Sequence, residues 1–177
     1  NIEKSIESAQ NKLLKTFEEP SKDAFFILTT TNLNLVLPTI RSRCSKIELA
    51  KLSKDVISKF FDGNENKEII TALSDGLIGK ARKLSSFKNL KLMFDSVLDC
   101  VTRLSSSKEV LAYSKKLMTF KDEFSLLIET FSLLVEELLY LRAGKDNLMR
   151  LLSVRQRLSD SVRDYSIKAL VEIQNLI

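Results

Sequence analysis

The chain carries two kinds of hydrophobic pattern, which change near residue 50. A helical stripe covers residues 2–17, and two short apolar runs, Phe25–Leu28 and Ser45–Leu49, follow it. Short runs that are aromatic and β-branched are typical of strands buried on both faces. Pro38, between the two runs, is suited to the first position of a short helix. Residues 1–50 therefore predict helix, strand, short helix and strand, which is part of an α/β sheet.

The rest of the chain shows only helical periodicity. Ser53 is the expected N-cap of the first of three short helices, and Asp75-Gly76 is the expected end of the second. Longer apolar stripes follow from Leu90, which predicts four to five amphipathic helices packed as a bundle. The predicted fold class is mostly α, with one partial α/β subdomain of two strands.

The composition excludes several kinds of site but does not identify the function. Hydrophobic residues make up 44% and charged residues 29% of the 177, as in ordinary globular proteins. The net charge of +5 comes from basic and acidic residues that alternate, which favours a solvated surface over a nucleic-acid patch. The chain has no histidine and two cysteines, so we expect no metal site. Both cysteines are expected to be small buried residues. Two cysteines give no disulfide framework, which suits the reducing cytoplasm. No apolar run is long enough to span a membrane.

Three stretches carry a resemblance to a known family. They are the run Ala9–Pro20 (AQNKLLKTFEEP), the run FFILTTTN that begins at Phe25, and the run Leu37–Cys44 (LPTIRSRC). Together they resemble the clamp-loader subunits of bacterial DNA polymerase III, which belong to the AAA+ ATPase superfamily. The resemblance implies three domains: the C-terminal part of an ATPase-type domain at 1–50, a three-helix lid at 51–88 and a helical collar for oligomerisation at 89–177.

Arg43 is the residue to which the resemblance gives a catalytic role. A guanidinium is a planar fork of donors that suits a phosphate, and an arginine supplied in trans can accelerate phosphoryl transfer by about 10³ to 10⁵. By resemblance, Arg43 reaches the γ-phosphate of ATP on a neighbouring subunit, with Thr39 and Ser42 at the same interface. The alternative is that Arg41 and Arg43 are surface arginines that interact favourably with the end of a helix.

Two further sites follow from the resemblance. Thr30, Thr31 and Asn32 match the sensor 1 region, where a polar side chain positions the attacking water. Their alternative role is to satisfy backbone groups after a strand. The sensor 2 region matches the run from Gly76 to Arg82, within which Gly79, Lys80 and Arg82 are the candidate residues. Gly79 occupies the position of the sensor 2 arginine, which looks like the delta-prime subunit, a family member that does not hydrolyse ATP.

Other expectations concern ligands. The 177 residues contain no phosphate-binding loop of the form G-x-x-x-x-G-K-[ST]. We therefore expect a C-terminal fragment that binds no cofactor alone and contacts the ATP and magnesium of a neighbour in trans. Lys12 and Lys15 are candidates for DNA phosphate contacts, although exposed lysines on helices are ordinary.

The predicted function is a non-catalytic clamp-loader subunit that supplies an arginine finger. Its expected partners are the gamma/tau motor subunits, the delta subunit, the sliding clamp and primer-template DNA. Two alternatives stay open: an ATP-hydrolysing gamma/tau motor, and a helical interaction domain with no role linked to ATP.

Overall fold

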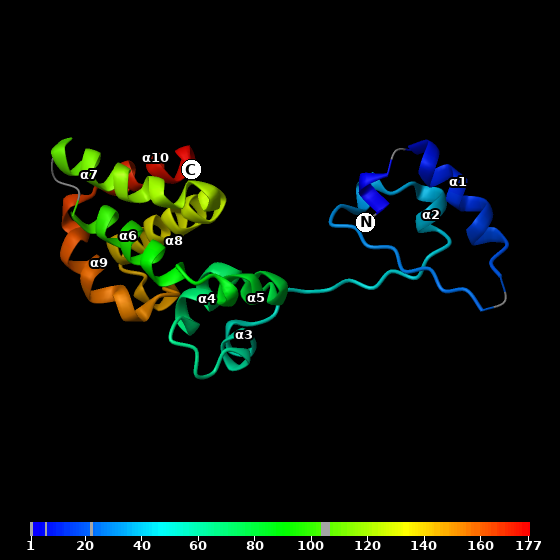
Figure 1. Cartoon of the computed structure of the whole chain (residues 1–177), viewed down its shortest axis with the longest axis horizontal. Helices are drawn as coiled ribbons and strands as arrows, with labels where there is room; N and C mark the ends of the chain where they lie inside the picture. The colour runs from blue at the N-terminus through cyan, green and yellow to red at the C-terminus, as the bar shows by residue number, and fades with distance from the viewer. Residues whose placement is uncertain (1, 6, 22, 104–106) are drawn as a thin grey trace. The chain divides into compact units, whose positions relative to one another are not determined.

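The structure is a computed structural model that describes residues 2–5, 7–21, 23–103 and 107–177. The chain divides into two compact units, residues 1–50 and residues 51–177 (Figure 1). Each unit has its own hydrophobic core. The two units are therefore described separately.

The first unit is built on helix α1 (Glu7–Glu18) and the short helix α2 (Pro38–Arg41), with 3₁₀ turns η1 (Ile2–Lys4) and η2 (Leu33–Leu35) (Figure 1). Its core is small. Ile2, Val36 and Ile40 are buried, and partly buried apolar side chains surround them: Leu13, Leu14, Phe17, Leu28 and Leu37. The apolar face of α1 therefore packs on the segment that contains α2.

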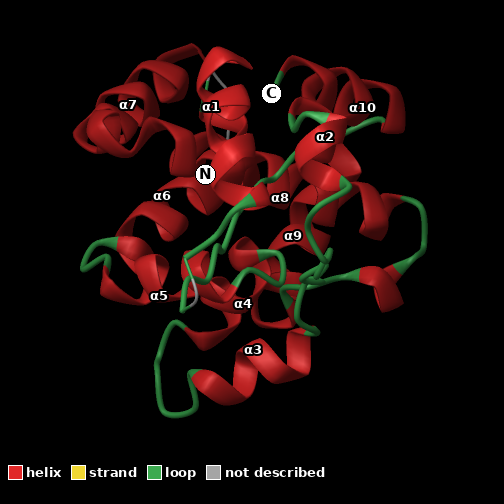
Figure 2. Cartoon of the chain, turned by 90° about the vertical axis from the view of Figure 1, so that its right-hand side faces the viewer, coloured by secondary structure: helices red, strands yellow, loops and turns green. Residues whose placement is uncertain are grey.

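The two predicted strands are wrong. No segment of the described ranges forms a strand, and Figure 2 shows helices and loops there. The side chains of the apolar runs point largely into solvent: Phe25 is 95% exposed, Ile27 88%, Ile47 84% and Leu49 91%. A strand needs a neighbour to satisfy its backbone groups and cover its faces, and these two runs do not pair with each other. They are extended segments without a sheet.

The helix predicted over residues 2–17 is divided. Residues Ile2–Lys4 form a 3₁₀ turn, and the α-helix begins at Glu7. Ile6 lies outside the described residues. The break has a local reason, because the backbone carbonyls of Ile2 and Ser5 accept hydrogen bonds from the side-chain amide of Gln10.

In the described part of the second unit every regular element is a helix, and the mostly α fold class is confirmed. Its α-helices are α3 (Lys54–Phe60), α4 (Lys67–Ser74), α5 (Ile78–Ser86), α6 (Leu90–Arg103), α7 (Ser107–Leu117), α8 (Phe124–Arg142), α9 (Arg155–Ser161) and α10 (Ile167–Leu176). The 3₁₀ turns are η3 (Met118–Glu123), η4 (Asp146–Leu148), η5 (Leu152–Val154) and η6 (Val162–Asp164).

Helix α8 is the centre of this unit. It packs against α4, α6, α9 and α10, and one apolar cluster extends from Ile57 on α3 to Leu170 on α10. The helices expected to form a lid and a collar thus share a core, while the assignment of 51–88 and 89–177 to those two domains stays a prediction.

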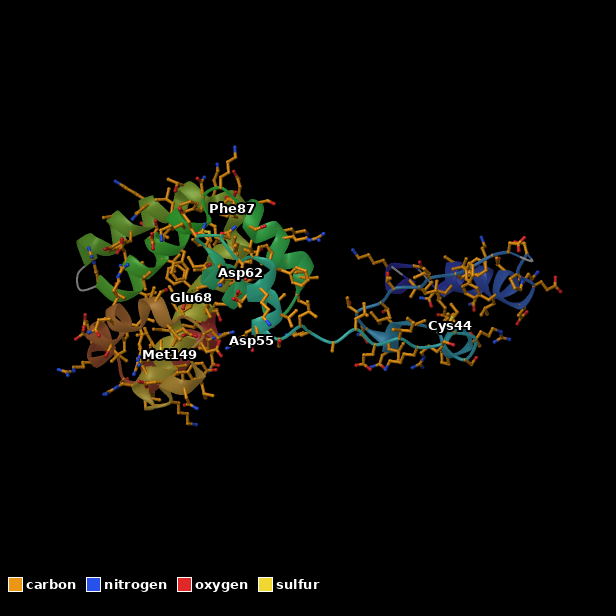
Figure 3. All side chains as sticks on the ribbon, turned by 90° about the horizontal axis from the view of Figure 1, so that it is seen from below. Cys44, Asp55, Asp62, Glu68, Phe87 and Met149 are labelled. Carbon is orange, nitrogen blue, oxygen red and sulfur yellow. The ribbon has the colours of Figure 1, made fainter. Side chains whose placement is uncertain are left out.

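Carboxylates from two helices, one of them fully buried, fix the loop that precedes α9. Glu137 on α8 has no exposed surface and accepts hydrogen bonds from the backbone N–H groups of Arg150 and Leu151. Glu68 on α4 accepts from the next two N–H groups, those of Leu152 and Ser153; Figure 3 labels Glu68 and Met149 in this unit. Two helices therefore hold one loop through its backbone.

Helices begin and end where the sequence predicts when the capping residues are strong. Ser53 accepts a hydrogen bond from the N–H of Val56, as expected of an N-cap. Asp75 and Gly76 both have positive φ angles, of 49° and 79°, and end α4. The C-terminal segment forms two helices, α9 and α10, because Tyr165 is extended and Ser166 caps α10.

Among the described residues, no helix is long and apolar enough to cross a membrane.

Candidate functional site: an arginine turn held by helix α1

Arg43 directly follows a short, well-anchored helical turn. Pro38 occupies the first turn of α2, and Ile40 is only 1% exposed in the core of the first unit. The N–H of Ser42 donates to the carbonyl of Pro38 at 3.0 Å, and the N–H of Arg43 donates to the carbonyl of Ile40 at the same distance. The backbone that carries Arg43 is therefore fixed by the core on one side and by helical hydrogen bonds on the other.

The guanidinium of Arg43 has two partners within its own unit. Its Nη2 lies 2.6 Å from Oε1 of Glu18, the last residue of α1, and its Nη1 donates to the backbone carbonyl of Thr39 at 3.0 Å. The side chain is still 39% exposed. A guanidinium has five N–H donors, so the donors not used here can donate hydrogen bonds to an anion from solvent or from another subunit.

Thr39 and Ser42, the two interface candidates, lie beside Arg43. Both residues are exposed, and the hydroxyl of Ser42 donates to the same carbonyl of Thr39 that Arg43 uses, at 3.1 Å. One backbone oxygen thus orders two side chains of the Ser-Arg-Cys triplet. Their place at a subunit interface stays a prediction.

Gln10 organises this site, and sequence reasoning missed it. It is 3% exposed, and its Nε2 lies within hydrogen-bond distance of the carbonyls of Ile2, Ser5 and Leu35. Its Oε1 accepts from the N–H of Leu37, directly before α2. A signal was present, because a glutamine three residues before Leu13 interrupts the apolar stripe of α1 and needs hydrogen-bond partners when buried.

Two of the sensor 1 candidates, Thr30 and Asn32, make hydrogen bonds to nearby backbone groups in this structure. The hydroxyl of Thr30 donates to the carbonyl of Asn32 at 2.9 Å and accepts from its N–H at 3.1 Å. The side chain of Asn32 caps η2 by accepting from the N–H of Asn34. Thr31 is exposed on the same segment. The water-positioning role of these three residues stays a prediction.

The sensor 2 candidates belong to the second unit, on α5. A Cβ at Gly79 would meet no atom within 4 Å, so the position is open, and Arg82 is exposed. Lys80 is engaged elsewhere, since its Nζ lies 2.6 Å from Oε2 of Glu129 on α8. Lys80 therefore ties α5 to α8.

Lys12 and Lys15 are exposed on α1, as the prediction of phosphate contacts requires. Exposure alone does not separate a DNA contact from a solvated helix face, so this role stays a prediction.

Cys44 is exposed, and the prediction that it is buried is wrong (Figure 3). The chain leaves the core after α2 and gives the thiol no cover. Cys100 on α6 is buried as expected, and burial raises the pKa of its thiol. Within the described part of the chain, no three metal-ligating side chains gather into a group.

Comparison with known proteins shows what the first unit is similar to. Residues 1–53 match the family model described as DNA polymerase III, delta subunit. The matched segment contains all of the first unit, including Gln10, Glu18 and Arg43. This part of the chain is therefore similar to subunits of DNA polymerase III.

The individual relatives are subunits of the same polymerase. The chain is 36% identical over 78 residues to DNA polymerase III subunit delta' of Haemophilus influenzae, covering 42% of this chain and 24% of that protein. It is 38% identical over 79 residues to subunit gamma of Buchnera aphidicola subsp. Schizaphis graminum, covering 41% and 22%. It is 35% identical over 78 residues to subunit tau of Bacillus subtilis, covering 38% and 14%.

The matched stretches span about a quarter or less of the length of these relatives. No solved structure matches the chain significantly.

Proposed function

We propose that this chain is part of a delta-prime-type subunit of a bacterial clamp loader, an AAA+ protein of the cytoplasm. In this role Arg43 acts in trans on ATP and magnesium bound to a neighbouring gamma/tau motor subunit. The assembly, which also contains a delta subunit, places the sliding clamp on primer-template DNA. The helices of residues 89–177 supply the collar through which the subunits associate.

One observation carries this proposal. Arg43 follows a turn fixed by the core, yet its guanidinium keeps donors for a further partner. An arginine that only balanced the end of a helix needs neither a fixed backbone nor a fixed side chain. A finger needs both, because its contribution to phosphoryl transfer depends on meeting charge at a defined position.

The motor subunit is the second candidate function, and the likeness to gamma and tau relatives favours it. Gly79 argues against it, because the open position on α5 offers no guanidinium to the chain's own nucleotide. ATP hydrolysis by the complete protein in the absence of other subunits would establish the motor and refute the delta-prime role.

The test of the proposal uses the complete protein assembled with its motor and delta subunits. ATP turnover stimulated by clamp and primed DNA is compared for wild type, Arg43→Ala and Arg41→Ala, after equal assembly has been verified. Arg41 is a matched control, since it is an exposed arginine of the same turn. We expect Arg43→Ala to lower turnover well beyond twofold and Arg41→Ala to leave it unchanged. Equal turnover in all three assemblies refutes the finger.

A further inference from the structure

We propose that Glu18 is the positioning residue for Arg43: its carboxylate, with the Thr39 carbonyl, orients the guanidinium toward the neighbour's phosphate. This inference rests on the proposed function. It adds a specific role for Glu18 in the geometry of the finger.

The place of Glu18 in its own helix gives the first support. Glu18 is the last residue of α1, where the exposed carbonyl groups give the helix end a partial negative charge. A carboxylate is unfavourable at that end and offers α1 no capping bond. Its 2.6 Å contact with Arg43 supplies the favourable interaction that the helix does not.

The geometry of Arg43 gives the second support. Its two bonds use different terminal nitrogens, Nη2 for Glu18 and Nη1 for the Thr39 carbonyl. Because the guanidinium is planar, two contacts at different nitrogens set the direction of the plane as well as its position. A single contact would leave the plane free to rotate.

The exposure of the pair decides how the carboxylate acts. The side chains of Arg43 and Glu18 are 39% and 49% exposed, so solvent screens their attraction. Such a pair is too weak to keep a guanidinium from a phosphate that carries more charge than one carboxylate. Glu18 therefore orients the guanidinium of Arg43 but does not prevent it from binding a phosphate.

The two residues at the ends of the turn are both held by α1. Gln10 accepts a hydrogen bond from the N–H of Leu37 before α2. Glu18 accepts one from the guanidinium of Arg43 after it. Helix α1 thus sets the backbone of the turn with an amide and the direction of the side chain with a carboxylate. Only the carboxylate contact is expected to alter chemistry without altering the fold.

The experiment compares Glu18→Gln with Glu19→Gln in the complete protein, assembled with its motor and delta subunits. Glu19 is the matched control, because it is the adjacent exposed carboxylate and makes no ion pair with Arg43. We expect Glu18→Gln to lower the kcat of stimulated ATP turnover about two- to fivefold, the scale of a half-exposed ion pair. The KM for ATP should not change, and Glu19→Gln should match wild type.

A second set of variants distinguishes orientation of Arg43 by Glu18 from a general structural effect of the substitution. In an Arg43→Ala background, Glu18→Gln should lower kcat no further, since no guanidinium is left to orient. Glu18→Asp, which keeps the charge, should recover part of the lost kcat. An equal loss in both backgrounds, or an unchanged or raised kcat for Glu18→Gln alone, overturns the positioning role. If Arg43→Ala itself has no effect, the finger fails and the positioning role fails with it.

Discussion

Gln10→Glu should destabilise the first unit strongly, although the two side chains have nearly the same shape. The Nε2 of Gln10 faces the carbonyls of Ile2, Ser5 and Leu35 at 3.4, 3.2 and 3.2 Å. The substitution replaces this donor with an oxygen that faces the same carbonyls. The bond from the N–H of Leu37 is kept, because Oε1 remains an acceptor.

The magnitude follows from the contacts and the burial. Each hydrogen bond contributes about 0.5–1.5 kcal/mol net, and each buried polar group left unsatisfied costs about 1–3 kcal/mol. With Gln10 3% exposed and three carbonyls affected, we expect the substitution to cost roughly 3 kcal/mol at pH 7. That corresponds to about a hundredfold loss of protection in local opening, since every 1.4 kcal/mol is tenfold.

The loss should depend on pH with a defined sign. Burial disfavours the charged form, so the pKa of the introduced carboxyl is higher in the folded unit than in the unfolded chain. The folded state then binds the proton more tightly, and the variant is most stable below the unfolded pKa of about 4.3. Its stability falls as the pH rises through the folded pKa, from about 4 toward 7.

The assay is amide hydrogen exchange followed by mass spectrometry, with rates corrected for the intrinsic pH dependence. Peptides from α1 and α2 report on the first unit, and peptides from α8 serve as an internal reference. Asn11→Asp is the control, because it makes the same amide-to-carboxylate change at the adjacent exposed position. Protection in α1 within threefold of wild type, or a loss equal at pH 4 and pH 7, would refute the reasoning.

Two more predictions concern the second unit and the cysteines. Gly76→Ala should lower the free energy of unfolding by about 2 kcal/mol, because φ is +79° and the new Cβ would lie 2.6 Å from the Leu52 carbonyl oxygen. Gly79→Ala, in open space on a helix, should raise the free energy of unfolding by about 0.5–1 kcal/mol. Urea unfolding in which both variants change this free energy in the same direction contradicts the prediction. A maleimide at pH 8 should label exposed Cys44 rapidly, whereas Cys100 should react only on unfolding, since burial raises its thiol pKa and lowers its thiolate fraction. Equal labelling rates would be inconsistent with the fold.

Helix ends and the turn before Arg43 could be read from sequence because their causes are local. The Ser53 cap, the Asp75-Gly76 stop and the Pro38 start each depend on neighbouring residues alone. The strands at Phe25 and Ser45 failed for the opposite reason. An apolar run indicates that a segment suits a strand, but the strand exists only when another segment pairs with it.

The partners of polar side chains were also beyond the sequence. The contact between Glu18 and Arg43 joins residues 25 positions apart, and that between Gln10 and Leu37 joins residues 27 apart. Periodicity places each residue on a face of its helix, but it does not say which loop folds back onto that face. A candidate role for Arg43 could therefore be proposed from the sequence. The carboxylate that contacts its guanidinium could not be predicted.

The central position of α8 has a mechanical consequence. Glu129 and Ser132 lie on neighbouring turns of this helix; the first binds Lys80 of α5, and the second accepts a hydrogen bond from Gln174 of α10 at 2.7 Å. A close-packed core resists gradual deformation, and Glu129 and Ser132 are less than one helical turn apart on α8. We therefore expect a tilt of α5 to reach α10 through this short part of α8. Helix α8 thus couples α5 to α10, and we expect a displacement of one helix to be passed to the other through it.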